Sequence, residues 1–244
     1  MWYRLSALVF WATLAFGADV CRSLPDRPAD RSNYRDERRP LSFRLSVKPG
    51  GPAFRITVRS RLSNYSDHLA VAGDIEVARC TDGTRLQLLT IMASQPIDFA
   101  VTFDPSDINF DGYLDFSVLG AFGGKWGSRL WWVFEPVTGR FVQNVLTREL
   151  GELGTNGYQI DPKKHEITTQ SLMAGCPSLV TRYRVEDNHL LRIHEEIGRQ
   201  VIETGALQPD PPAGVPCTVT VSDLVGGAMR VTDVQRFVEG EPVK

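Results

Sequence analysis

Residues 43–48 read FRLSVK and residues 54–59 read FRITVR, and in both stretches every second residue is apolar. Successive side chains of a β-strand point to opposite faces of the sheet, so this alternation predicts strands with one buried and one solvated face. The Pro-Gly-Gly sequence at 49–51 lies between the two stretches and is typical of a turn. We therefore expect an antiparallel hairpin here.

The same two-residue period recurs along the rest of the chain, and no helix longer than about two turns is expected. Turn sequences near residues 138, 163 and 187 follow one another at nearly equal spacings, which fits propeller blades as well as ordinary hairpins. The further expected strands are centred on residues 75–77, 99–103, 114–118, 130–134, 179–185, 191–193 and 219–221. The sequence thus predicts an all-β fold, an antiparallel hairpin meander that is either propeller-like or a sandwich.

The composition is that of an ordinary globular protein. Of 244 residues, 42% are hydrophobic and 23% are charged, and 27 basic residues stand against 29 acidic ones, a formal net charge of −2. Nucleic-acid binders commonly concentrate positive charge on one face. The near-neutral balance therefore argues against a nucleic-acid partner.

The N-terminus has the pattern of a secretory signal peptide. A single Arg4 precedes an apolar run over residues 5–16, and small residues lead to a cleavage site expected after Gly17. The run is shorter than the ~20 apolar residues of a membrane-spanning helix. We expect a signal peptide over 1–17, a flexible leader over 18–40 and a single β-rich domain over 41–244, in a periplasmic or secreted protein without a transmembrane segment in the mature chain.

Export to an oxidising compartment makes the four cysteines disulfide candidates. Val20 stands before Cys21 where a lipid-modified cysteine prefers a small residue, so a soluble exported protein is favoured over a lipoprotein. Four cysteines allow three connectivities, and spacing alone does not choose among them. Both Cys176 and Cys217 lie in turn-rich sequence, which slightly favours their pairing with each other and leaves Cys21 and Cys80 as the remaining candidates.

Residues 107–115 read DINFDGYLD and carry the strongest chemical motif. Oxygen side chains at the first, third and fifth positions converge in a tightly coiled loop, and glycine at the sixth position permits the turn. Oxygen-only donors suit a hard cation, so we expect Ca²⁺ in a structural role. The residue at position twelve is Val118 and a strand follows, which excludes an EF-hand. The expected ligands are Asp107, Asn109, Asp111, Asp115 and the carbonyl of Tyr113.

Other motifs are weak. The Gly-rich stretch 120–128 lacks the spacing of a phosphate loop and is expected to be a mobile loop beside the calcium site, carrying Lys125 and Trp126 outward. Trp131 and Trp132 must point to opposite faces of one strand, one into the core and the other either under a second layer or exposed as a partner anchor. No nucleophile or zinc motif is present, so we do not expect an enzyme.

Residues 107–115, the Gly-rich loop, the Trp-bearing strand, residues 134–141 and the hairpin at 183–190 together resemble a bacterial family of exported calcium-loop proteins with a propeller-like β fold. The resemblance covers roughly residues 95–200. Known members include periplasmic immunity proteins that inhibit lysozyme-like toxins delivered by type IV secretion systems. The resemblance implies the same calcium ligands and a protein partner, a peptidoglycan hydrolase.

The leading hypothesis is therefore a periplasmic calcium-binding protein that binds and inhibits a lysozyme-like, peptidoglycan-degrading toxin. Lys125 and Trp126 are the candidate partner-binding residues. The alternative is an extracytoplasmic glycan-binding protein or hydrolase, which would use an exposed tryptophan as an aromatic platform. A third reading is a calcium-stiffened module without a specific partner.

Overall fold

The computed structural model describes residues 19–26, 40–63, 66–97, 102–123, 126–153, 158–171, 179–200, 217–238 and 241–243. The described strands form three sheets, and in each sheet strands that are consecutive in sequence lie side by side and pair antiparallel. The predicted all-β antiparallel meander is confirmed. The propeller-like arrangement is wrong, because the three described sheets stay open and form neither a closed barrel nor a ring of blades.

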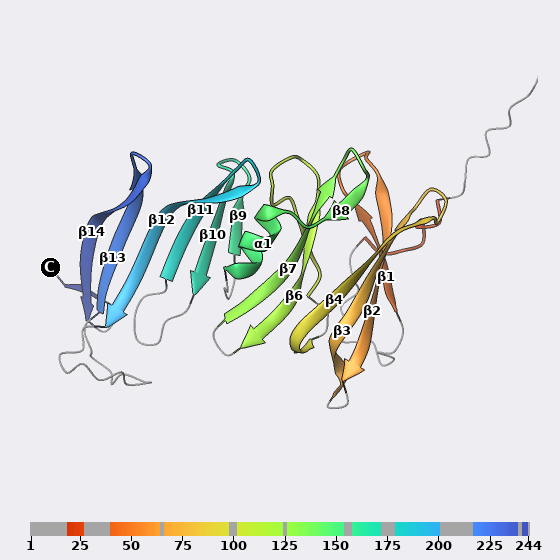
Figure 1. Ribbon diagram of the computed structural model, residues 1–244, viewed down its shortest axis with the longest axis horizontal. Coiled ribbons are helices and arrows are strands. Elements are labelled where there is room, and N and C mark those ends of the chain that lie inside the picture. The colour runs from red at the N-terminus through yellow and green to blue at the C-terminus, as the bar shows by residue number, and fades with distance from the viewer. Residues whose placement is uncertain are drawn as a thin grey trace, which may run out of the picture.

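The first two sheets contain four strands each and occupy one half of the molecule (Figure 1). Residues 98–101 lie outside the described residues, so most of the strand expected over 99–103 is not placed. The first sheet comprises β1 (Leu41–Ser46), β2 (Ala53–Ser63), β3 (Ser66–Arg79) and β4 (Arg85–Ile97). The second comprises β5 (Asp104–Ser106), β6 (Asp115–Gly123), β7 (Trp126–Glu135) and β8 (Arg140–Val142).

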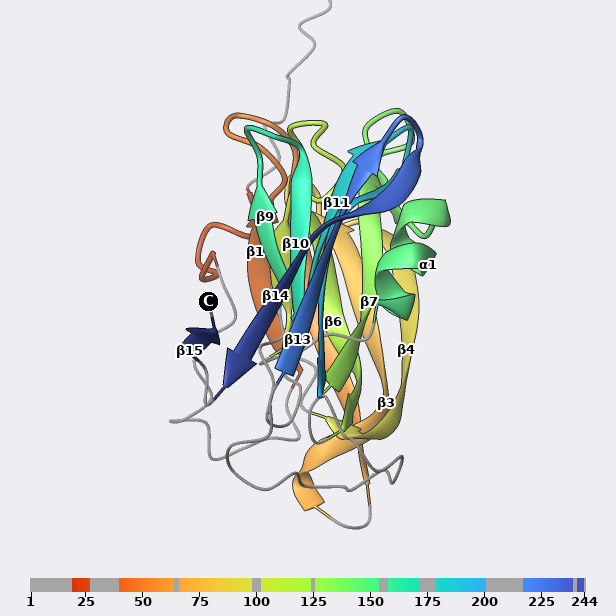
Figure 2. The ribbon, with the colours of Figure 1, turned by 90° about the vertical axis from the view of Figure 1, so that its left-hand side faces the viewer.

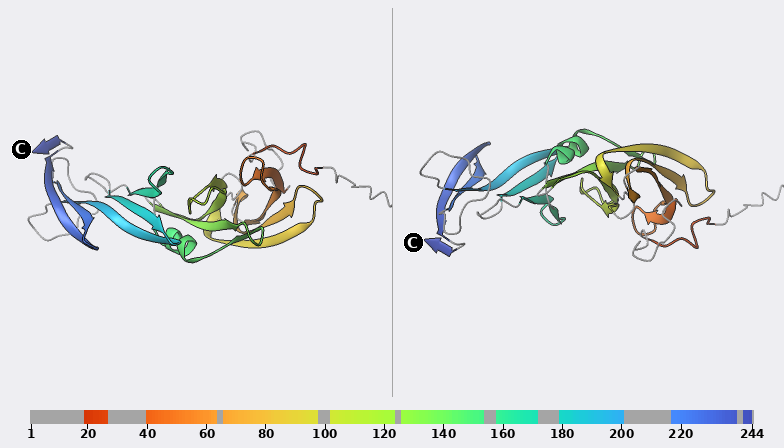
Figure 3. Two further views of the ribbon diagram at one scale, coloured as in Figure 1. Left: turned by 90° about the horizontal axis from the view of Figure 1, so that it is seen from above. Right: turned by 90° about the horizontal axis from the view of Figure 1, so that it is seen from below.

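The third sheet continues the molecule along its long axis, and α1 (Val145–Glu152) lies between it and β7. Seen from above, the sheets follow one another along a curved path (Figure 3). The sheet comprises β9 (Tyr158–Asp161), β10 (Glu166–Ser171), β11 (Leu179–Glu186), β12 (His189–Gln200), β13 (Cys217–Val225), β14 (Ala228–Val238) and β15 (Glu241–Val243). β13 and β14 form the far end, where Val231 and Val234 of β14 are more than half exposed (Figure 2).

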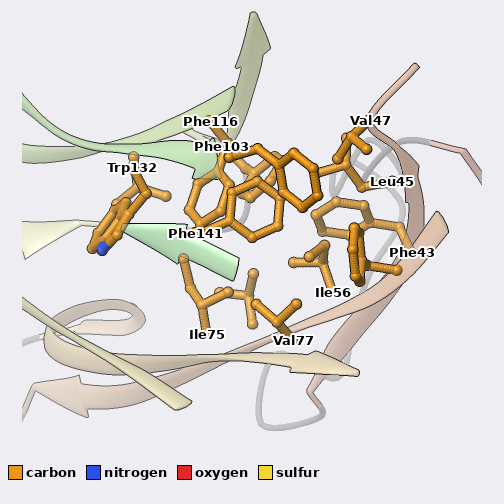
Figure 4. Close-up of a cluster of buried hydrophobic side chains, with 14 of the residues drawn as sticks. Phe43, Leu45, Val47, Ile56, Ile75, Val77, Phe103, Phe116, Trp132 and Phe141 are labelled. Atoms are coloured by element: carbon orange, nitrogen blue, oxygen red, sulfur yellow. The ribbon is translucent and has the colours of Figure 1, made fainter. Parts of the chain in front are cut away.

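The main hydrophobic core lies between the first and second sheets (Figure 4). Phe116 of β6 is fully buried at its centre, with its ring 4.9 Å from that of Phe103, 5.2 Å from Trp132 and 4.8 Å from Phe141. The alternating apolar residues of β1 and β2 face this cluster, as their two-residue period predicts. These two sheets therefore pack as a sandwich, which is the second of the two predicted arrangements.

Strand β7 is buried on both faces. Trp132 and Phe134 enter the main core, whereas Trp131 and Val133 enter a second cluster with Leu146 of α1 and residues of the third sheet. Trp131 is 2% exposed and Trp132 is 5% exposed. The prediction that the two tryptophans point to opposite faces is confirmed, and the second one is covered by another layer rather than exposed.

Helix α1 was not predicted from the sequence, although a capping box marks its start. The Asn144 side chain accepts a hydrogen bond from the Thr147 N–H at 3.0 Å, and the Thr147 hydroxyl accepts one from the Asn144 N–H at 2.8 Å. Glu149 accepts a hydrogen bond from the Leu190 N–H at 2.7 Å. The helix is thereby tied to the start of β12, and it covers the second face of β7.

The segment assigned to a flexible leader is held against the first sheet over residues 19–26. Cys21 is buried and bonded to Cys80, and the Asp19 carboxylate lies 3.4 Å from the Arg44 guanidinium. Arg44 also donates its N–H to the Pro25 carbonyl at 2.8 Å. The signal peptide expected over 1–17 and the leader residues 27–39 lie outside the described residues.

Replacement of Phe116 by alanine is expected to destabilise the protein by about 3–5 kcal/mol, because it leaves a cavity at the centre of the main core. Chemical denaturation of the two proteins measures this difference. Val137→Ala is the matched control, since Val137 is 94% exposed and its truncation should change the free energy of unfolding by less than about 0.5 kcal/mol. Similar losses in the two variants would contradict the central place of Phe116.

Candidate functional site

The loop over residues 107–115 connects β5 to β6 and is coiled as its sequence predicts. Asp107 accepts hydrogen bonds from the N–H groups of Asp111 at 3.1 Å and Gly112 at 3.0 Å. Asn109 accepts one from the Asp111 N–H at 3.2 Å. Gly112 has a φ of +83°, a left-handed conformation that glycine adopts without strain. The polar side chains therefore fold back over the backbone of their own loop.

Asp115 closes this loop and binds it to β7. The side chain is fully buried, and one oxygen accepts the Ile108 N–H at 3.0 Å while the other accepts the Phe134 N–H at 2.8 Å. Burial raises the pKa of Asp115 to about 7; the two N–H donors oppose the rise, and the charges of Asp111 and Asp107 add to it. One carboxyl group thus connects the loop with the strand shared by both cores.

The donor set suits a hard cation. It comprises three carboxylates, one amide oxygen and a backbone carbonyl, and none of the three carboxylates has an ion-pair partner in the described part of the chain. Partial burial raises the pKa of Asp107, and the neighbouring charge of Asp111 adds to that rise. A bound Ca²⁺ would supply the positive charge that offsets this repulsion. The residues therefore fit calcium in their chemistry.

The carboxylates are not gathered around one point, however. Among the described residues, Asp19, Cys21 and Cys80 are the only three His, Cys, Asp or Glu side chains whose ligand atoms lie within 4.8 Å of one another, and there the two cysteines form a disulfide. The loop carboxylates accept backbone N–H groups instead. The side chain of Tyr113 turns away from the loop, and its hydroxyl accepts a hydrogen bond from the Lys48 ammonium at 2.6 Å.

The Gly-rich stretch does not lie beside the loop, so that part of the prediction is wrong. β6 begins at Asp115 and ends at Gly123, and β7 begins at Trp126, opposite Gly123. At ~3.3 Å per residue the strand separates the hairpin tip from the loop by roughly 25 Å. Lys125 lies outside the described residues, and Trp126 is placed only as the first residue of β7.

The structure gives the pairing of two of the four cysteines. Cys21 pairs with Cys80, and the described chain leaves no cysteine free. Cys217 is disulfide-bonded as well, and Cys176, the partner that its turn-rich surroundings favour, lies outside the described residues. These bonds agree with a protein that folds in an oxidising compartment.

A pocket that sequence reasoning did not find opens between the first and second sheets, with a volume of about 490 Å³. Phe54, Leu86, Tyr113 and Phe134 give it apolar walls, and Lys48 and Arg79 are its charged residues among those described. The walls come from segments far apart in the chain. No local motif therefore marks this pocket.

A second missed feature is a polar cluster on the third sheet. His194 is buried, and its ring nitrogens lie 2.7 Å from Asp223 and 2.9 Å from Glu196. Asp223 also accepts a hydrogen bond from the Thr232 hydroxyl at 2.6 Å, and this bond and the one to His194 hold the pKa of Asp223 below its usual value. The cluster joins β12, β13 and β14, and only the strand register brings it together.

The fold can be compared with those of known proteins. A search with models of protein families and a search of curated proteins find no match for this chain. A solved structure described as a Xanthomonas type IV secretion system related protein is similar in fold, with a TM-score of 0.51 and 15% sequence identity. The similarity covers 78% of this chain and 93% of that one. Among the described residues, no helix has the length and apolar character required to cross a membrane.

The raised pKa of Asp115 predicts that its contribution to stability falls as the pH rises. The folded state retains the proton up to about pH 7, whereas the unfolded chain releases it near 3.8. The contribution is therefore complete below about pH 4 and is lost as the pH passes 7, with an upper limit of about 4 kcal/mol. Denaturation of the wild type and of Asp115→Asn in chelator, between pH 4 and 8, measures it as the difference between the two curves.

The free energy of unfolding of the wild type, relative to that of Asp115→Asn, should fall as the pH rises. Asp82→Asn is the control, because Asp82 lies on the surface and its pKa is lowered, chiefly by the N–H of Thr84. The free energy of unfolding of Asp82→Asn should therefore still show the decrease with rising pH that Asp115 causes. A difference between wild type and Asp115→Asn that is flat, or that grows with pH, would contradict the effect of burial.

Proposed function

We propose that this chain is an exported, calcium-stabilised β protein that binds a partner protein and inhibits it, the partner being a peptidoglycan-degrading, lysozyme-like toxin. The observation that carries the proposal is the fold shared with a type IV secretion system related protein over 93% of that protein's length. The Cys21–Cys80 disulfide supports export, because such bonds form and persist in oxidising compartments.

The role assigned to calcium is structural. The proposed ligands are Asp107, Asn109, Asp111, Asp115 and the carbonyl of Tyr113, all within one loop. Since Asp115 already accepts two backbone N–H groups, a cation on this loop would stabilise its charged form and keep both hydrogen bonds. The ion would thereby strengthen the connection between the loop and β7.

The aromatic-platform alternative loses its main support. Trp131 and Trp132 are both buried, so neither offers a ring to a sugar. The surface that we assign to the partner is the tip of the β6–β7 hairpin, where Lys125 and Trp126 lie in sequence. Tryptophan is among the residues that most often dominate the energetics of protein interfaces.

Calcium is expected to raise the melting temperature. With a Kd near 10⁻⁴–10⁻³ M, about 10 mM calcium stabilises the folded state by about 2 kcal/mol, which corresponds to a rise of roughly 5 °C. Thermal melts in calcium and in chelator measure the rise. Asp111→Ala should abolish it and Asp82→Asn should retain it. Equal melting temperatures of the wild type in calcium and in chelator would refute the site.

The inhibitory role is tested with a purified lysozyme-like peptidoglycan hydrolase. The two purified proteins should form a complex on size-exclusion chromatography, and clearance of a cell-wall suspension by the hydrolase should fall as this protein is added. Trp126→Ala should weaken inhibition at least about tenfold. Lys164→Ala is the control, because Lys164 is an exposed lysine of the β9–β10 turn, remote from that hairpin tip.

Two results decide the inhibition test. Neither a complex nor protection of the cell wall at a molar excess of this protein would refute the inhibitory role. Full inhibition by Trp126→Ala would instead refute the assigned surface and leave the role itself in place.

A further inference from the structure

The pocket between the first two sheets has the form of a small-molecule site. Its volume of about 490 Å³ lies within the range of such sites, which combine apolar walls with a few polar groups. Phe54 and Phe134 are buried residues of the main core that line it, and Leu86 and Tyr113 line it as well. The inner surface therefore offers apolar contact to a ligand.

The charge of the pocket has one sign. Its twelve described lining residues include two cations, Lys48 and Arg79, and no carboxylate. Arg79 forms an exposed ion pair with Asp82 at 3.4 Å. Lys48 has no carboxylate partner among the described residues, and its ammonium donates to the Tyr113 hydroxyl at 2.6 Å. An ammonium has three donors, so two remain for a ligand.

Backbone and side-chain contacts between the segments around Lys48 and Tyr113 hold this ammonium in place. The Val47 carbonyl accepts the Leu114 N–H at 2.6 Å, which joins the residue before Lys48 to the residue after Tyr113. The Lys48 ammonium also lies 4.1 Å from the centre of the Tyr113 ring. An anion bound here would thus meet a cation that is already in place beside an apolar wall.

We propose that this pocket binds a small amphipathic carboxylate. The apolar body of the ligand packs against Phe54, Leu86 and Phe134, and its carboxylate accepts hydrogen bonds from the Lys48 ammonium. Hydrogen bonds between ionised groups are about twice as strong as neutral ones, so the charge of the ligand contributes to affinity as well as to orientation. This site is separate from the proposed partner surface at the β6–β7 tip and requires neither the partner nor calcium.

The test compares two probes of the same shape, 4-phenylbutyrate and its neutral analogue 4-phenylbutanol, by NMR titration of the ¹⁵N-labelled mature protein. Phenylbutyrate should shift the amide signals of residues 53–54, 79–81, 134–135 and 137–139, which surround the pocket. We expect it to bind at least about ten times more tightly than phenylbutanol, since a charge-assisted hydrogen bond is lost with the alcohol.

Lys48→Met removes the ammonium and keeps most of the side-chain length, so the affinity for phenylbutyrate should fall about tenfold while that for phenylbutanol changes little. Lys163→Met is the control for a change of net charge, because Lys163 is exposed in the β9–β10 turn. Ala53→Phe places a ring in the pocket and should reduce the binding of both probes. The melting temperature of each variant establishes that it is folded.

Three outcomes would overturn the proposal. They are equal affinities for the two probes, an unchanged phenylbutyrate affinity in folded Lys48→Met, and shifted signals confined to residues away from the pocket, such as those of β14. The experiment contains no hydrolase and is carried out in chelator, so its failure would leave the proposed inhibitory function standing. Failure of the inhibition assay would likewise leave the pocket unaffected.

Discussion

Strand β7 is buried on both faces, and the arrangement of the whole molecule depends on it. Trp132 and Phe134 complete the core between the first two sheets, whereas Trp131 and Val133 complete the core with α1 and the third sheet. Large aromatic side chains bury more apolar area than any others, so two neighbouring tryptophans stabilise two layers at once. Without this strand the second cluster would lose Trp131 and Val133, the buried residues through which the second sheet contributes to it.

The buried Asp115 carboxylate extends this dependence to the loop before β6. It accepts the N–H groups of Ile108, which lies in one core, and Phe134, which lies in the other. A buried acid is costly when it is charged, and the nearby Asp107 and Asp111 increase that cost. The position therefore favours either a proton or a cation. This is the physical reason why a calcium loop suits the start of this strand.

The two-residue period predicted the strands well, because a half-buried strand requires it whatever the sheet packs on. The same period says nothing about which layer covers a face, so it did not distinguish a sandwich from a propeller. Helix α1 was missed because it spans only eight residues, although Asn144 and Thr147 form its capping box. His194 and the pocket were missed for another reason, since their partners come together only through strand register and sheet packing.

Tyr113 links the loop to the pocket in a way that its sequence position did not suggest. The motif assigns its backbone carbonyl to the cation, while its side chain forms a wall of the pocket and accepts a hydrogen bond from Lys48. An ion in the loop would therefore contact the backbone of Tyr113, and a carboxylate in the pocket would lie beside its side chain. If the ion changes the affinity of the pocket for the carboxylate, the carboxylate must change the affinity of the loop for the ion by the same factor, because binding free energies are linked reciprocally. The outer strands of the third sheet lie at the other end of the molecule, so they are remote from this coupling.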